Sequence, residues 1–164
     1  MIDLTSTPII ILAILGSVGV ALPVINIGLK EKGSVISYGI ATLIALFASI
    51  GYVLYQLVLD HVAPAALFSQ DVLVDDAFGA LFAIAMLIVA IFTTVGSFNY
   101  MKNKDNPSIY FSLILLSAIG MVLVAYSTDL VMLFIAWELM SIPTYILVGF
   151  LKKDPISNEA AIKY

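Results

Sequence analysis

The stretch Leu130–Leu151, LVMLFIAWELMSIPTYILVGFL, decides how this chain folds. It is almost wholly apolar and carries a single charge, that of Glu138. A helix needs about 20 predominantly apolar residues to cross about 30 Å of hydrocarbon, and this stretch is long enough. Backbone groups left unpaired in lipid are costly, so a segment of this kind is predicted to be a helix.

Four further stretches of similar length carry no charge at all. Each is long enough to cross the membrane as a helix. The sequence therefore predicts an all-α integral membrane protein with five transmembrane helices. The predicted spans lie at about residues 8–29, 35–59, 77–101, 108–127 and 130–151.

The composition excludes several classes of protein. The chain has 164 residues, 62% of them hydrophobic and 11% charged, whereas a soluble domain carries about 25% charged residues. This argues against a soluble enzyme and against disorder. Nucleic-acid binding is disfavoured because the net charge is −4 and no basic cluster exceeds two adjacent lysines. There are no cysteines, no glycine-rich phosphate loop and no pair of histidines, so no cofactor or metal is expected in this chain.

The lysines predict the orientation of the chain. Six of the seven lie between the first and second spans, between the third and fourth, or just after the fifth, and there is no arginine. The loops on the other side hold acids and no lysine. By the positive-inside rule the lysine-rich loops are cytoplasmic and the N-terminus is outside. Those six are Lys30, Lys32, Lys102, Lys104, Lys152 and Lys153.

The longest predicted loop, 60–76, is acidic and is placed on the outer face. Its apolar residues allow a short hairpin there. His61 is a proton relay, a metal ligand or an ordinary exposed loop histidine. Asp75 and Asp76 could gather cations near an exit, or they could cap the helix that begins at residue 77. Thr7 is predicted to cap the first helix.

Glu138 is the informative residue. It lies about nine residues into its span, about 13 Å at 1.5 Å per residue, which is near the middle of the bilayer. An ionised acid there costs about 2.5–3.5 kcal/mol on insertion scales. Such a carboxyl either carries protons or pairs with a buried cation, whereas the structural alternative is a hydrogen bond between helices by a neutral glutamate.

The neighbours of Glu138 predict a polar seam. Ser141 and Tyr145 follow it at i+3 and i+7, with Thr144 beside them. Pro143 has no N–H for the carbonyl four residues before it. These groups together could hold water in the interior of the bundle, which a carboxyl needs in order to exchange protons inside a membrane.

The tail, 155–164, reads as the start of a sixth helix. Asp154 is followed by Pro155, which suits a cap and a first turn, and Glu159 with Lys163 forms an i,i+4 pair in the favourable order. The residues alone leave open whether this is a surface stub with a solvated ion pair or half of a further span.

Two stretches carry a resemblance to a known family. DLVMLFIAWELMSIPTYILV at 129–148 and NEAAIKY at 158–164 resemble the antiporter-like proton-translocating membrane subunits of respiratory complex I, deazaflavin-dependent methanogen dehydrogenases, membrane hydrogenases and multisubunit cation/proton antiporters. The signature is an acid in a W-E-L-x-S-x-P context, with E-A-A-x-K-Y about 20 residues later. The N-type subunit is the most similar, on Ser-Ile-Pro-Thr-Tyr and Glu-Ala-Ala-Ile-Lys-Tyr.

The resemblance implies a mechanism and partners. In the family the glutamate of the fifth helix pairs with a lysine of the seventh, and changes in such charges move protons through half-channels. Glu138 matches that glutamate, and Lys163 matches an auxiliary lysine of the sixth helix. The resemblance also implies partner membrane subunits, with flavin or deazaflavin, iron–sulfur clusters and quinone outside this chain, in a prokaryotic plasma membrane.

The chain also departs from the family. Members have about fourteen helices, and the seventh and eighth, which hold the central lysines, are missing from this sequence. The stretch is therefore expected to be the N-terminal part of the fold, either a truncated portion or one completed by another chain, and not to translocate protons by itself. Three functions stay open: a proton-translocating subunit of a redox-driven complex such as an NADH:quinone dehydrogenase, a subunit of a cation/proton antiporter, and a non-catalytic membrane scaffold.

Overall fold

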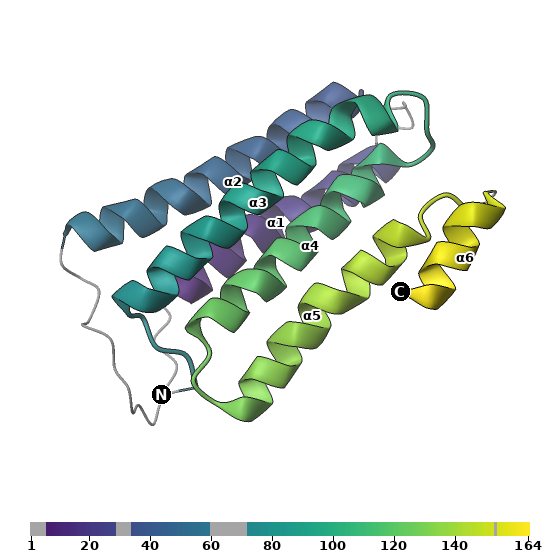
Figure 1. Ribbon diagram of the computed structural model, residues 1–164. Coiled ribbons are helices and arrows are strands. Elements are labelled where there is room, and N and C mark those ends of the chain that lie inside the picture. Colours follow the sequence, from purple (N-terminus) through teal and green to yellow (C-terminus); the bar gives the residue numbers. More distant parts are fainter. Residues whose placement is uncertain (1–5, 29–33, 60–71, 153) are drawn as a thin grey trace.

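The computed structural model describes residues 6–28, 34–59, 72–152 and 154–164, and this part of the chain is helical apart from short connections (Figure 1). Its first five helices are each long and apolar enough to cross a membrane. The prediction of an all-α protein with five spans is thereby confirmed. The helices are α1 Thr7–Gly28, α2 Val35–Val58, α3 Ala77–Met101, α4 Pro107–Tyr126, α5 Leu130–Val148 and α6 Pro155–Lys163.

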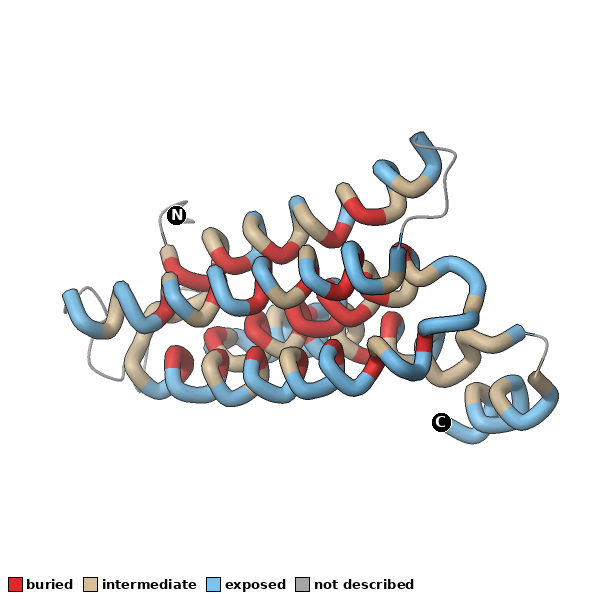
Figure 2. Tube along the Cα trace, turned by 90° about the horizontal axis from the view of Figure 1, so that it is seen from above, coloured by how far each residue is buried: buried red, intermediate tan, exposed pale blue. Residues whose placement is uncertain are grey.

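Helix α4 is the centre of the bundle. It packs against α1, α2, α3 and α5. Of the residues in its most apolar 18-residue stretch, 56% are buried. The buried residues line the inside of the bundle, and α6 has none (Figure 2). In α5 only 17% of the residues in the corresponding stretch are buried. This helix therefore lies at the edge of the bundle, and the described part of the chain leaves most of its surface uncovered.

Short polar side chains begin several of these helices. Asp76 Oδ1 accepts the N–H of Gly79 at 2.7 Å at the start of α3, and Asp154 accepts an N–H at the start of α6. A side-chain acceptor at this position satisfies a backbone donor that has no partner within the helix. The caps predicted at Asp76 and Asp154 are confirmed.

The start of α1 differs from the prediction. Thr7 is the first residue of the helix and not its cap, so that prediction is wrong. The N–H of Thr7 donates instead to Asp75 Oδ2 at 2.8 Å, across 68 positions of sequence. Because Asp76 alone occupies the capping position of α3, the carboxylate of Asp75 is available to the neighbouring helix.

The predicted outer loop, 60–76, lies outside the described residues up to position 71, and so do its predicted hairpin and His61. From residue 72 the chain runs beside the α4–α5 connection. Leu73 and Ser127 form an isolated antiparallel bridge, and the N–H of Val74 donates to the carbonyl of Tyr126 at 2.9 Å. These bonds hold the start of α3 against the end of α4.

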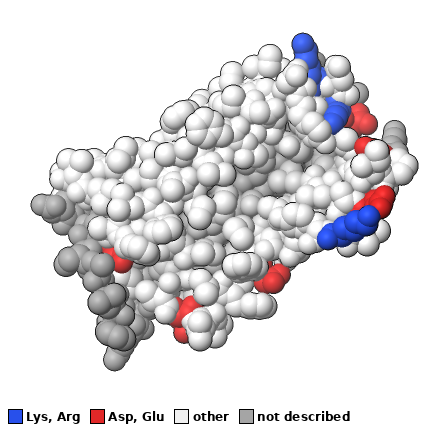
Figure 3. Space-filling model, viewed as in Figure 1, with Lys and Arg blue, Asp and Glu red and all other residues white. Residues whose placement is uncertain are grey.

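Helix α5 ends at Val148, before the predicted limit of residue 151. Gly149 follows it, and Ser157 of α6 donates its hydroxyl to the carbonyl of Val148 at 2.8 Å. The chain then turns back, and α6 lies against the end of α5 (Figure 1). On the face seen in Figure 3, the lysines gather at this end of the bundle.

Candidate functional site

Glu138 is the only charged residue within the five long helices. Asp129 caps α5 by accepting the N–H groups of Val131 and Met132 at 2.9 and 3.1 Å. From the first residue of the helix to Glu138 the rise is about 12 Å at 1.5 Å per residue, so the carboxyl lies near the middle of the span. Glu138 is partly buried, and within the described segments it makes no hydrogen bond or ion pair.

Directly beyond Glu138, α5 meets α4 with backbone against backbone. A β-carbon on Gly120 would stand 2.4 Å from the Met140 nitrogen and 2.8 Å from the Leu139 carbonyl carbon. Ser117, one turn earlier in α4, donates its hydroxyl to the Met140 carbonyl at 3.2 Å. Small residues at a helix interface allow this close approach in membranes. The contact therefore fixes the height and the rotation of α5 around Glu138.

The predicted seam residues differ in how far they are buried. Ser141 and Pro143 are buried, and Pro143 has no N–H to give to the Leu139 carbonyl. Thr144 bonds back to the carbonyl of Ser141 at 2.7 Å. Tyr145 is 43% exposed, so the seam becomes less buried toward the end of α5.

The open side of α5 is mostly apolar. Phe134, one turn before Glu138, is 64% exposed, and Trp137 and Ile142 are also exposed. In a membrane, such a face meets lipid or further helices. A partner for the Glu138 carboxyl would reach it from this side, because α4 covers the other.

Lys163 lies on α6 and forms the predicted ion pair with Glu159, which is confirmed. Both side chains are exposed, and neither bonds to Glu138 in the part of the chain described. The rings of Tyr164 and Tyr145 meet edge to face, with centroids 5.4 Å apart. The structure thus brings Tyr164 to the seam, while the Lys163 side chain bonds to Glu159 within α6.

Two residues that shape this site were not predicted. Ser117 and Gly120 lie in the most buried helix and make the contact opposite Met140. Their signal in the sequence is a pair of small residues three positions apart within an apolar run. That pattern indicates a close helix contact but does not say with which helix. Among the described residues no three His, Cys, Asp or Glu side chains come together as a metal site would need.

Comparisons with known proteins show which membrane subunits this chain is similar to. The family model described as "NADH:quinone oxidoreductase/Mrp antiporter, TM" matches residues 127–164, which contain α5 and α6. The NADH-quinone oxidoreductase subunit N 1 of Solibacter usitatus is 36% identical over 159 residues, which are 96% of this chain and 31% of that protein. Subunit N of Desulfitobacterium hafniense is 34% identical over 155 residues, 90% of this chain and 31% of that protein.

A relative from an archaeon carries a different name. The F(420)H(2) dehydrogenase subunit N of Methanosarcina mazei is 37% identical over 98 residues, 60% of this chain and 20% of that protein. The chain spans about a third of the length of its bacterial relatives and less of this one. With five apolar helices, the chain is similar over nearly its whole length to the antiporter-like membrane subunits of respiratory complex I and its relatives, and to subunits N in particular.

Proposed function

We propose that this chain is part of a proton-translocating membrane subunit in a complex I-like, redox-driven dehydrogenase, and that Glu138 carries the proton within the membrane. The observation that carries the proposal is that the five spans hold one charge, placed near the middle of α5. The similar proteins are named as subunits N of NADH-quinone oxidoreductase and of F(420)H(2) dehydrogenase.

The physical basis is a carboxyl whose charge depends on its partner. Apolar surroundings favour the protonated form of Glu138, and a cation within about 4–6 Å favours the charged form. The open side of α5 leaves room for a helix that brings such a cation. Moving one charge across 100 mV requires about 2.3 kcal/mol, which approach and withdrawal of one lysine can supply.

Ser141, Pro143, Thr144 and Tyr145 are proposed to support the transfer. The hydroxyls of Ser141 and Thr144, with the carbonyl that Pro143 leaves without its helical donor, offer polar partners to water beside the carboxyl. Lys163 is proposed as an auxiliary proton-transfer residue. Support comes from the contact of Tyr164 with Tyr145, which holds the end of α6 at the seam.

The orientation and the partners belong to the same proposal. The lysine-rich end is cytoplasmic and the N-terminus is outside, because lysines stay on the cytoplasmic side of spans. The membrane is the plasma membrane of a prokaryote. Other membrane subunits adjoin the chain, and flavin or deazaflavin, iron–sulfur clusters and quinone belong to partner subunits, so that this chain carries out no redox chemistry itself.

The test is Glu138→Gln in the assembled complex. The protons translocated per electron are measured in proteoliposomes, together with the rate of electron transfer and the amount of assembled complex. We expect coupled proton movement to be lost while the complex still assembles. Asp105→Asn is the matched control, since it makes the same change at an exposed position outside the spans, and it should translocate normally. Normal proton stoichiometry in Glu138→Gln would overturn the proposal.

A subunit of a cation/proton antiporter is the second candidate, because the matching family model covers both kinds of protein. Sodium-dependent proton exchange that needs no redox substrate would select it. If Glu138→Gln is harmless but Glu138→Leu weakens association with the other subunits, the carboxyl only bonds a neighbouring helix, and the chain is a scaffold.

A further inference from the structure

Among the described residues, three buried oxygen atoms at the end of the bundle opposite the lysines have no hydrogen-bond partner. They are Thr7 Oγ1, Asp75 Oδ1 and Tyr126 Oη. Thr7 and Tyr126 are each only 1% exposed, so bulk solvent does not reach them. Buried polar groups in folded proteins nearly always have a partner, and three exceptions in one place call for a physical reason.

The three groups lie in one junction between α1, α3 and α4. The N–H of Thr7 bonds to Asp75 Oδ2, which puts the other oxygen of that carboxylate beside the start of α1. The carboxylates of Asp75 and Asp76 both act electrostatically on the hydroxyl of Tyr126. A bond from Val74 to the Tyr126 carbonyl closes the junction from the backbone side.

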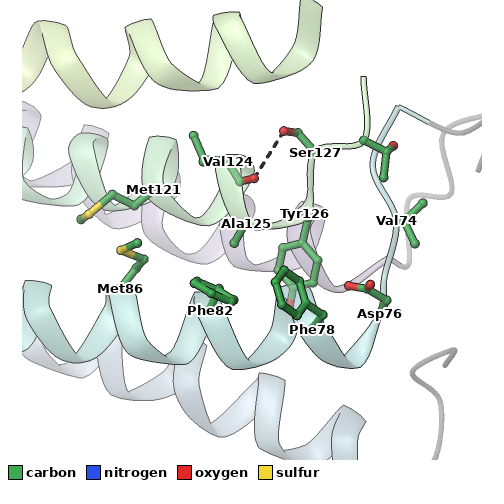
Figure 4. A pocket seen from close by; sticks show the side chains of 11 residues that line it. Val74, Asp76, Phe78, Phe82, Met86, Met121, Val124, Ala125, Tyr126 and Ser127 are labelled. Carbon is green, nitrogen blue, oxygen red and sulfur yellow. Dashed lines mark hydrogen bonds between the residues drawn. The ribbon is translucent and has the colours of Figure 1, made fainter. Parts of the chain in front are cut away.

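Gly79 brings the tyrosine ring and the acidic pair together. A β-carbon there would stand 2.7 Å from Tyr126 Cδ1 and 2.8 Å from Asp76 Oδ1. Figure 4 shows the Asp76 carboxylate directed toward the rings of Phe78 and Tyr126, which line a cleft between α3 and α4. The cleft, about 470 Å³, is lined mostly by apolar side chains. Tyr126 lines this cleft and also belongs to the junction, whereas Thr7 and Asp75 are not among the residues that line the cleft.

The chemistry of the three atoms is complementary. The hydroxyls of Thr7 and Tyr126 each donate one hydrogen and also accept, and Asp75 Oδ1 only accepts. None of the three bonds to another. Asp76 is already used, because its Oδ1 accepts the N–H of Gly79. One small species within reach of all three oxygens would give each of them a partner.

We propose that the oxygen atoms of Thr7, Asp75 and Tyr126 form a binding site for one small ligand, a water molecule or a sodium ion, which is called the guest below. The guest joins the start of α1, the segment before α3 and the end of α4. A water molecule with three polar partners is the usual occupant of such a site, and a hard cation takes the same oxygen ligands. The site is independent of Glu138 and of the proposed function.

The site is tested by whether substitutions in it raise or lower the midpoint of thermal unfolding. The full chain is placed in lipid nanodiscs, and its thermal unfolding is followed by the fluorescence of Trp137, the only tryptophan. Tyr126→Phe and Thr7→Val remove one hydroxyl each. Asp75→Asn removes the charge but keeps an oxygen for the N–H of Thr7. With a guest bound, each variant loses a partner of that guest, and we expect the midpoint to fall by about 2–4 °C.

The double variant Tyr126→Phe with Asp75→Asn measures the coupling. If both residues hold the same guest, the second substitution has little left to remove, and the double variant unfolds above the midpoint expected from adding the two single shifts. If instead Tyr126→Phe raises the midpoint, or the two shifts add, the hydroxyl is an isolated buried group whose removal relieves a burial penalty. Either result overturns the site.

Ser108 supplies the matched control. Its hydroxyl is also buried and has no partner within the described part of the chain, but it lies at the other end of α4, about 27 Å from Tyr126 at 1.5 Å per residue. Ser108→Ala should not lower the midpoint and should add to Asp75→Asn without coupling.

The two guests are separated by exchanging sodium chloride for choline chloride at equal ionic strength. A midpoint that rises with sodium in the native chain but not in Asp75→Asn identifies a sodium ion. Coupled variants whose midpoints do not respond to sodium identify water. Both outcomes uphold the site, and neither depends on proton translocation.

Discussion

Gly120 of α4 lies against the backbone of Met140 in α5, so closely that a β-carbon on Gly120 would stand 2.4 Å from the Met140 nitrogen. Met140 follows Glu138 by two residues, on the span that carries the one intramembrane acid. The contact sets how near α5 approaches the centre of the bundle. It also leaves the opposite side of α5 open, which is where a partner for the carboxyl has access.

Gly120→Ala is expected to destabilise the chain strongly. Its β-carbon would meet the Met140 backbone, which cannot move aside without shifting α5. Overpacking of this kind costs about 1–3 kcal/mol or more, measured as a lower midpoint of thermal unfolding in nanodiscs. Gly51→Ala in α2 is the control, since nothing lies within 4 Å of that position, and it should be neutral or stabilising. Equal midpoints for the two variants would contradict the contact.

Gly39→Ala is expected to cost less than Gly120→Ala. A β-carbon there would stand 2.2 Å from Phe98 Cε1, but a ring can turn to another rotamer at a modest cost. Replacing the ring with a smaller side chain, as in Phe98→Leu, should recover part of the loss in the double variant. Thermal unfolding of the single and double variants measures this. A double variant less stable than the sum of the single losses would argue against a clash between these two positions.

Ser117→Ala is expected to loosen the contact of α4 with α5. The substitution removes the hydrogen bond from the Ser117 hydroxyl to the Met140 carbonyl, and a net loss of about 0.5–1.5 kcal/mol follows. Ser37→Ala, at an exposed position of α2, provides the comparison. The bond would be unimportant if both variants unfolded at the native midpoint.

Asp129→Ala is expected to fray the start of α5. The carboxylate accepts two backbone N–H groups there, and loss of a capping side chain costs about 0.5–2 kcal/mol. Asp129→Asn keeps an oxygen acceptor and should retain most of the stability. Amide hydrogen exchange at Val131 and Met132 reports the change directly. Faster exchange in the alanine variant alone is the expected result, and unchanged exchange in both would exclude the cap.

Tyr145→Ala is expected to release α6 from α5. The edge-to-face contact with Tyr164 is one of the few that hold α6, which has no buried residue. Amide exchange across 155–163 should become faster, while that of α4 stays as it is. Tyr55→Ala removes a somewhat more exposed tyrosine from α2 and should leave α6 unchanged. Protection of α6 that survives Tyr145→Ala would show that other contacts hold it.

The helices and several of their starts could be predicted from the residues themselves. Each span is a charge-free or nearly charge-free run long enough to cross a bilayer. The caps at Asp76 and Asp154 follow from a short acid just before such a run or before a proline. The pair of Glu159 with Lys163 follows from their spacing of four. These features are local, because each depends on residues within one or two turns of each other.

The positions of neighbours across the bundle could not be predicted in this way. Asp75 bonds to Thr7 across 68 positions, although both residues had a reasonable local role as caps. Ser141 is buried against α4 while Tyr145 is partly open, although the two lie on nearly the same face of the helix. The difference arises because the close contact at Gly120 covers only part of that face.

The sequence by itself determined that the chain is a set of apolar helices, where most of them begin, and that one of them carries a single acid near its middle. It did so because a helix satisfies its own backbone hydrogen bonds within a few residues, and lipid demands that it does. The tertiary structure decided which sides of α5 are covered, that Gly120 meets Met140, and that Asp75 serves α1. In lipid no strong hydrophobic force orders apolar helices, so their arrangement depends on close packing and on a few polar bonds between distant residues.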